Sequence, residues 1–180
     1  MPQAVTHVLI ALIIASLIRD YVISRKGRKS FPLHYVLIAG IGGLLPDIDI
    51  IAFWILNWFG FTIGEVHRTF THALFVPLIF LIIGLLTSKL KNKELGRHHL
   101  KISIIFLMLG LGSFIHLVLD ASIAGMIRPF YPFSNFFIGY SITNHLPMPL
   151  AQIFFPSLDA ILLVLWISYM EWKHRISDFI

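Results

Sequence analysis

Two pairs of polar residues with metal-ligand chemistry stand inside long apolar stretches of this sequence. His116 and Asp120 are four residues apart, so on a helix both side chains project from one face and can share a cation. Asp47 and Asp49 would point apart on a regular helix, but three glycines and Pro46 precede them. A helix break here could turn both carboxylates inward, because broken helices commonly frame sites in membrane proteins.

A further pair of histidines belongs to the segment 67–72, which reads HRTFTH. Five residues turn a helix through about 140°, so this spacing fits a loop that enters a helix better than a continuous helix. Thr69 or Thr71 would cap the start of that helix. Arg68 could pair with Glu65, but its position between the two histidines favours binding of an anionic substrate.

The composition places these residues in a membrane protein. Of the 180 residues, 57% are hydrophobic and only 13% are charged, whereas soluble domains usually carry about a quarter charged residues. The formal net charge of +5 does not predict nucleic-acid binding, because the basic residues lie in short loops beside apolar segments. The chain has no cysteine, so any metal must be held by His, Asp, Glu and water.

We therefore expect an all-α integral membrane protein, a single domain over residues 1–180 with a bundle of about five transmembrane helices. The apolar runs cover about 4–23, 35–59, 72–87, 102–127 and 151–170. In the fourth run, Gly110, Gly112 and Ser113 would let neighbouring helices approach closely. The segment 128–150 is rich in proline and aromatic residues, which predicts a long outer loop at the level of the lipid headgroups.

Lysine and arginine are distributed unevenly about these runs. In a five-span arrangement, 12 of the 14 basic residues fall on one side and only Arg68 and Arg128 fall on the other. The positive-inside rule then predicts a multi-pass protein of the cell membrane with its N-terminus outside and its C-terminus in the cytoplasm.

This topology brings the polar residues of the membrane segments to one depth. Asp49 and His116 lie about 21 Å from the inner ends of their runs, and His7 opens the first run on the outer side. All candidates therefore fall in the outer half of a hydrocarbon layer about 30 Å thick. We expect a shared metal site formed by His7, Asp47, Asp49, His67, His72, His116 and Asp120.

Two other residues belong to the same outer layer. Asp159 would lie about 12 Å deep in the last run, where it could be a ligand, although we expect it to support the site. His145 lies in the outer aromatic loop and could reach the site from there.

Four motifs in this order resemble the YdjM-like family of membrane-bound metal-dependent hydrolases. They are Thr6-His7, the LLPDID of residues 44–49, the HRTFTH of residues 67–72 and the HLVLD of residues 116–120. The likeness runs over about residues 6–133 and includes Gly125 and Pro132-Phe133. The order of ligand types is also distantly similar to zinc-dependent phospholipase C, from which this chain departs in lacking a clear second HxxxE motif for a third metal.

The resemblance implies hydrolysis of a membrane-lipid phosphoester at the outer leaflet, with one to three Zn²⁺ ions as cofactor and Mn²⁺ as the alternative metal. In this hypothesis the lipid bilayer supplies the substrate. His116 would belong to the metal site, Asp49 would orient or deprotonate water, and Arg68 would stabilise charge on the phosphoryl group.

Two alternatives stay open. A metal-free lipid phosphatase would use a histidine as nucleophile, but it would need a richer Lys/Arg cradle than the outer side offers. A non-enzymatic divalent-metal transporter or sensor would also explain the ligands. Transport would call for polar residues that continue toward the cytoplasmic half, and the inner halves of the runs are apolar.

Overall fold

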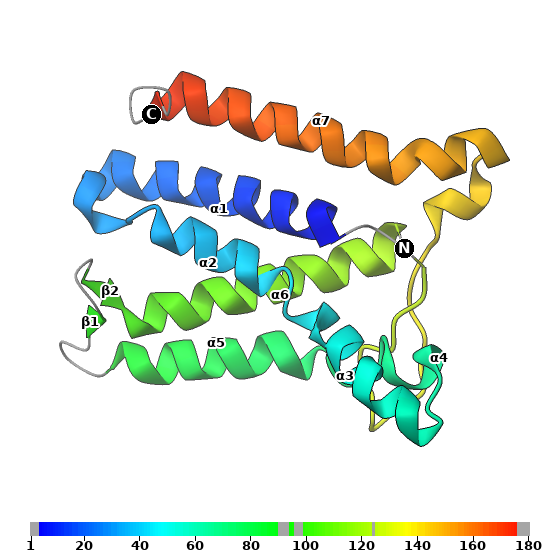
Figure 1. Cartoon of the computed structure of the whole chain (residues 1–180). Coiled ribbons are helices and arrows are strands. Elements are labelled where there is room, and N and C mark those ends of the chain that lie inside the picture. Colours follow the sequence, from blue (N-terminus) through cyan, green and yellow to red (C-terminus); the bar gives the residue numbers. More distant parts are fainter. Residues whose placement is uncertain (1–3, 90–93, 96–98, 124, 176–180) are drawn as a thin grey trace.

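The computed structural model describes residues 4–89, 94–95, 99–123 and 125–175, and helices form most of this part of the chain (Figure 1). Its elements are α1 (Ala4–Lys26), η1 (Arg28–Ser30), α2 (His34–Gly42), η2 (Pro46–Ile48), α3 (Asp49–Leu56), η3 (Asn57–Phe59), α4 (Ile63–Val66), α5 (Phe75–Ser88), β1 (Glu94–Leu95), β2 (Leu100–Lys101), α6 (Ile102–Ile123), η4 (Ile142–His145) and α7 (Met148–His174). The two strands form a short antiparallel ribbon.

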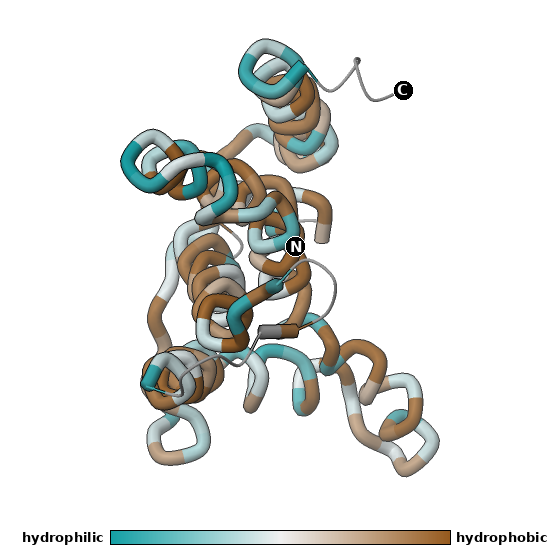
Figure 2. Tube along the Cα trace, turned by 90° about the vertical axis from the view of Figure 1, so that its left-hand side faces the viewer, coloured by the Kyte–Doolittle hydropathy of each residue, from teal (hydrophilic) through white to brown (hydrophobic). Residues whose placement is uncertain are grey.

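The long helices lie side by side in the order α7, α1, α2, α6, α5, and each packs against the next (Figure 1). α3 and α4 gather at one end, and the β1–β2 ribbon lies at the other. Colouring by hydropathy shows apolar residues along most of the helical trace, with hydrophilic stretches toward helix ends (Figure 2). The buried core between α1, α2 and α6 includes Leu9, Leu12, Val36, Ala39 and Met108.

The contact between α2 and α6 is made by backbones rather than side chains. A Cβ atom added to Gly112 would lie 2.1 Å from the carbonyl oxygen of Ala39, and one added to Gly42 would lie 2.5 Å from the carbonyl oxygen of Leu109. Ser113 donates a hydrogen bond across the same contact to the Gly42 carbonyl at 3.1 Å. The expectation that small residues on this helix permit close approach is confirmed.

The second predicted segment is broken where the sequence indicated. The two parts, Arg28–Gly42 and Pro46–Phe59, meet at an angle of 52°. Pro46 has no backbone N–H to donate and begins η2, so the helix cannot continue through it. After the break, Asp47 lies near His116 of α6, and Asp49 contacts the loop before α5.

The expectation of about five transmembrane helices is not confirmed. Within the described residues, three helices (α1, α6 and α7) are long and apolar enough to cross a membrane, and the bent pair could supply a fourth span. α5 has 14 residues, about 21 Å, which is shorter than a hydrocarbon layer of about 30 Å. It starts at Phe75 instead of residue 72, because the residues before it form an irregular loop.

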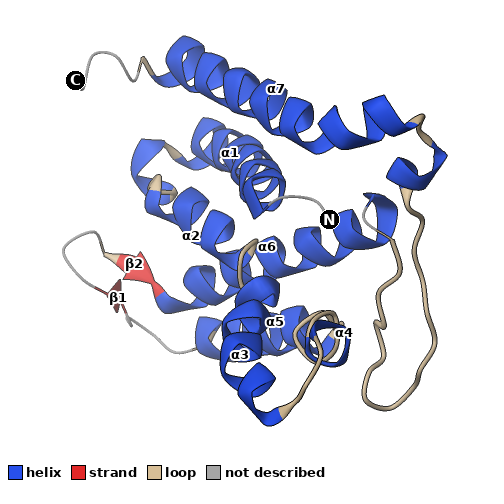
Figure 3. Ribbon diagram, turned by 45° about the vertical axis from the view of Figure 1, so that its right-hand side comes forward, coloured by secondary structure: helices blue, strands red, loops and turns tan. Residues whose placement is uncertain are grey.

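The segment 128–150 leaves the end of α6 as an extended loop and reaches α7 through η4 (Figure 3). Residues 127 and 138 pair across it as an isolated bridge, and Phe133 is 91% exposed. Its place in the headgroup zone stays a prediction. Lys91, Lys93 and Arg97, which contribute to the charge asymmetry, lie outside the described residues.

Polar contacts join α7 to α1 near both ends of their shared length. The Thr6 hydroxyl donates to the carboxylate of Asp159, and the Tyr169 hydroxyl donates to the carboxylate of Asp20. Otherwise α7 presents mostly exposed apolar side chains, as expected of a helix whose other faces contact lipid.

Candidate metal centre

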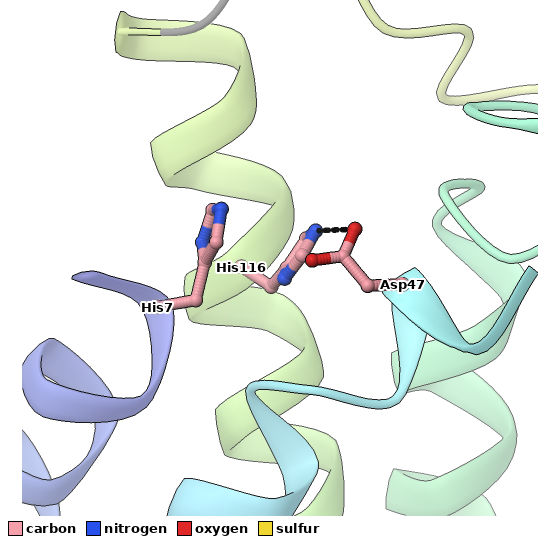
Figure 4. A group of neighbouring side chains, drawn as sticks. All are labelled: His7, Asp47 and His116. Carbon is pink, nitrogen blue, oxygen red and sulfur yellow. Dashed lines mark ion pairs between the residues drawn. The ribbon is translucent and has the colours of Figure 1, made fainter. Parts of the chain in front are cut away.

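Histidine and aspartate side chains from four separate parts of the chain meet at the end of the helical layers that carries α3. The first turn of α1 supplies His7, η2 supplies Asp47, the loop before α5 supplies His72, and α6 supplies His116 and Asp120. His72 and His116 are fully buried. Figure 4 shows His7, Asp47 and His116 converging from α1, η2 and α6.

The donor atoms form three overlapping sets, and within each set all of them lie within 4.8 Å of one another. The sets are His7, Asp47 and His116; Asp47, His67 and His72; and His72, His116 and Asp120. Asp47, His72 and His116 each belong to two sets. The cluster therefore has room for more than one adjacent cation, and all the predicted ligands except Asp49 belong to at least one set.

Two imidazoles face each other at the centre of this cluster. The Nδ1–H of His116 donates to the carbonyl oxygen of Gly43 at 2.8 Å, so its Nε2 carries a lone pair. His72 Nδ1 lies 3.2 Å from an oxygen of Asp49, which likewise directs its Nε2 lone pair inward. The two Nε2 atoms are 3.1 Å apart. Facing lone pairs repel unless a proton or cation lies between them.

A metal ion fits this arrangement. Two nitrogen ligands of a tetrahedral zinc ion are about 3.3 Å apart, close to the observed separation of the two Nε2 atoms. Oxygens of Asp47 and Asp120 lie 3.6 Å and 3.8 Å from His116 Nε2 and 3.5 Å each from His72 Nε2. Nitrogen and carboxylate oxygen donors in this ratio suit zinc or manganese.

Asp49 lies behind the histidines rather than among the donor sets. Its carboxylate accepts hydrogen bonds from His67 Nδ1 at 2.9 Å, from the backbone N–H of Arg68 at 3.2 Å and from the Thr71 hydroxyl at 2.7 Å. A carboxylate bonded to the outer nitrogen of a ligand histidine fixes the ring and its tautomer. Its role as a ligand or as a base stays a prediction, and these contacts favour a positioning role.

The expected helix cap is wrong. The N-cap residue of α5 is Leu74, whose side chain makes no capping hydrogen bond. Thr71 instead bonds to Asp49, and the Thr69 hydroxyl donates to the Val66 carbonyl at 2.6 Å. Both threonines therefore shape the loop that carries His67 and His72.

His7 completes one side of the cluster. Its ring stacks on that of His116 with the centroids 3.8 Å apart, and its Nε2 lies 3.5 Å from an Asp120 oxygen. Its Nδ1, like Nε2 of His67, is buried and has no hydrogen-bond partner among the described residues. Buried polar atoms are rarely left unpaired. Each of these two nitrogens is therefore a candidate metal donor.

Asp159 belongs to none of the donor sets. It accepts the hydrogen bond from Thr6, the residue before His7, and so links α7 to the first turn of α1. This contact agrees with the supporting role expected for it. His145 is exposed, stacks on Tyr140 and lies 2.9 Å from the Ser141 carbonyl through its Nδ1, and it is part of no donor set.

Arg68 lies at the mouth of the cluster. Its backbone has φ 62°, an uncommon left-handed conformation for a non-glycine residue, and this turns its N–H toward Asp49. Its Nε is 3.3 Å from an Asp120 oxygen but is not aligned for a hydrogen bond, so the contact is an ion pair and the guanidinium keeps donors for a ligand.

Arg68 does not pair with Glu65. The backbone N–H and hydroxyl of Thr62 donate to Glu65 at 2.8 Å and 2.7 Å, which closes a capping box on α4. These two hydrogen bonds, and chiefly the one from the backbone N–H of Thr62, hold the pKa of the Glu65 carboxyl below its usual value. Arg68 and Arg128 line a cavity of about 310 Å³ with His67, Met126 and Phe137.

Two contributors escaped the sequence analysis: the Gly43 carbonyl, which orients His116, and the Thr71 hydroxyl, which orients Asp49. The carbonyl gives no residue-type signal. A threonine beside a histidine ligand is only a weak sequence signal for a positioning residue, because threonine is also common at helix starts.

Thr71→Val should weaken metal binding about 10-fold without unfolding the protein. Valine keeps the shape of threonine but cannot donate to Asp49, so the carboxylate that orients His67 and His72 becomes less fixed. Titration of the metal-free protein with Zn²⁺ measures the change. Thr87→Val is the matched control, because that hydroxyl donates only to carbonyls within α5. Equal affinities for both variants would contradict the positioning role of Asp49.

Comparison with known proteins gives a family but no closer relative. Among curated proteins none matches the chain, and no solved structure does either. Residues 1–176 match the family described as YdjM inner membrane protein, which confirms the family resemblance and extends it over nearly the whole sequence. The protein with this buried His/Asp cluster therefore belongs to the YdjM inner membrane protein family.

Proposed function

We propose that this protein is a membrane-embedded, metal-dependent hydrolase that cleaves a phosphoester of a membrane lipid at the outer leaflet. The observation that carries the proposal is the buried pair of inward-facing imidazoles, His72 and His116, flanked by Asp47 and Asp120 beside an arginine-lined cavity. The Nδ1 contacts of both rings leave their Nε2 atoms free to face the same cation.

The metal would be held by the residues of the three donor sets, with zinc preferred and manganese as the alternative. When bound, it would supply Lewis acidity that activates water and polarises a phosphoryl oxygen. The hydrogen bonds of His116 to the Gly43 carbonyl and of His67 to Asp49, together with the ion pair of His72 with Asp49, would orient the ligand nitrogens for the metal.

The chain would also provide proton transfer. Both oxygens of Asp49 already accept hydrogen bonds, which leaves it poorly placed to take a proton from water. Asp47 is the more exposed carboxylate of the cluster, with 19% of its side chain accessible. We assign proton acceptance to Asp47 and retain Asp49 as the group that positions His67 and His72.

The adjacent cavity would recognise the substrate. Two guanidinium groups, Arg68 and Arg128, suit a phosphate because each can donate paired hydrogen bonds to its oxygens. Arg128 lies over the ring of Phe137 at 4.7 Å, a cation–π contact that holds it at the cavity wall. Met126 and Phe137 would contact the apolar part of a lipid.

We place the site at the outer leaflet because of the charge asymmetry of the sequence, which predicts that the cluster lies on the membrane side opposite the lysine-rich loops. A transport path is disfavoured by the buried apolar core of Leu9, Leu12, Val36 and Met108, which fills the space between α1, α2 and α6 beyond the cluster. A bound metal ion would therefore stay at the end of the helices that carries the cluster and would not pass through the protein.

Hydrolysis is tested with the purified protein in vesicles that contain phosphatidic acid, phosphatidylglycerol or an isoprenyl diphosphate. We expect release of phosphate or of a headgroup from at least one lipid, a fall of about 100-fold or more after treatment with a chelator, and recovery on adding Zn²⁺. Turnover that survives chelation would favour the metal-free phosphatase. A stoichiometric metal with no turnover on any of these lipids would favour a sensor.

A further inference from the structure

A second cavity opens at the other end of the helical layers, far from the His/Asp cluster. It has a volume of about 470 Å³ and lies between the end of α1, the turn into α2 and the start of α6. Along α1, its Lys26 is 19 residues beyond His7, which is about 29 Å at the helical rise. The cavity is therefore separate from the metal centre and lies near the opposite membrane face.

Three lysines surround this cavity, and each comes from a different element. Lys26 ends α1, Lys29 belongs to η1 and Lys101 belongs to β2. No acidic residue is among the described residues that line it. Like charges on three residues that line one space repel one another, and an anion bound among them would relieve that repulsion.

The backbone around the cavity is fixed by specific contacts. The buried Tyr35 hydroxyl accepts a hydrogen bond from the backbone N–H of Lys101 at 2.6 Å, which joins β2 to α2. Gly27 has φ 86°, a conformation that turns the chain sharply after α1. The Ser30 hydroxyl donates to the Gly27 carbonyl at 2.6 Å. These contacts fix the backbone segments that carry Lys26, Lys29 and Lys101 to the cavity.

The remaining wall is apolar along one side, while Ser30, Tyr35 and His99 add polar groups near the lysines. Val22, Phe31, Ile104, Leu107 and Met108 line it together with the lysines. A free phosphate would contact only the polar part of the lining and would gain nothing from the apolar side chains. An amphiphile with a phosphate head and a hydrocarbon chain would use both parts, and basic pockets between helices at a membrane surface bind such headgroups.

We propose that this cavity binds the phosphate headgroup of an anionic membrane phospholipid, with Lys26, Lys29 and Lys101 around the phosphate and the first part of an acyl chain against Leu107 and Met108. The site is independent of the proposed hydrolase function. It would fix the ends of α1 and α6 to each other and to the membrane face that the positive-inside rule places in the cytoplasm.

The test compares two triple variants of the full-length protein in neutral detergent. Lys26→Gln/Lys29→Gln/Lys101→Gln removes the charge of the cavity, and Arg25→Gln/Arg28→Gln/Lys89→Gln removes the same charge from neighbouring positions that do not line it. Binding of phosphatidylglycerol, phosphatidylcholine and inorganic phosphate is measured by native mass spectrometry. Circular dichroism checks that both variants are folded.

We expect the wild-type protein and the control variant to prefer phosphatidylglycerol over phosphatidylcholine. The cavity variant, which lacks all three lysines, should bind phosphatidylglycerol about 100-fold more weakly than the wild-type protein, or about fivefold for each lysine removed. Equal losses in both triple variants would overturn the proposal, because they would show general attraction of a basic surface for anionic lipid. Inorganic phosphate that binds as tightly as the lipid would overturn the assignment of a lipid ligand.

Discussion

His116→Ala is expected to abolish metal binding and, with it, at least about 99% of hydrolysis. The residue contributes Nε2 to two of the three donor sets, and removal of its ring also leaves the Gly43 carbonyl without its donor. Loss of one protein ligand from a site of three or four leaves too few donors to hold the ion. Elemental analysis of the purified variant measures metal content, and lipid turnover measures activity.

The control for this change is His145→Ala, which removes an exposed histidine that belongs to no donor set. This variant should keep the full metal content. Because alanine at a buried position could disturb folding, His72→Gln provides a second, more conservative removal of a central donor. Metal retained at wild-type stoichiometry in both His116→Ala and His72→Gln would show that the cluster is not a metal site.

The features that the sequence could predict are those that depend on local geometry. The four-residue spacing of His116 and Asp120 requires both to share a face once α6 forms, and Pro46 requires a break because it lacks a backbone donor. The distribution of Lys and Arg, together with the rise per residue of a helix, then predicted that polar residues of separate segments would lie at one depth in the membrane. The structure confirms that they meet at one end of the helices.

The features that escaped prediction depend on contacts between distant segments. The start of α5 is one example, because the backbone N–H of Leu74 donates to the Pro129 carbonyl at 2.9 Å and does not continue a helix through His72. The partners of Asp49 are another. They come from a loop about 20 residues later, and hydropathy gives no signal for how that loop folds.

Gly112→Ala is expected to destabilise the protein by at least about 3 kcal/mol, since even a well-tolerated overpacked site costs 1–3 kcal/mol. The added methyl group would lie 2.1 Å from the Ala39 carbonyl oxygen and 2.6 Å from the Gly43 nitrogen, and these are backbone atoms that cannot rotate away. α2 and α6 must therefore move apart. The midpoint of thermal unfolding should fall by roughly 5–10 °C, as measured by circular dichroism in detergent.

Gly64→Ala serves as the matched control, because a Cβ at this position in α4 meets no atom within 4 Å and the unfolding midpoint should not change. Separation of α2 from α6 also moves the Gly43 carbonyl away from His116, so Gly112→Ala should bind Zn²⁺ about 10-fold more weakly even below its unfolding temperature. An unchanged Zn²⁺ affinity in a destabilised variant would separate helix packing from the metal centre. Loss of both properties together would mean that the backbone contact between the two helices positions His116 in the candidate metal centre.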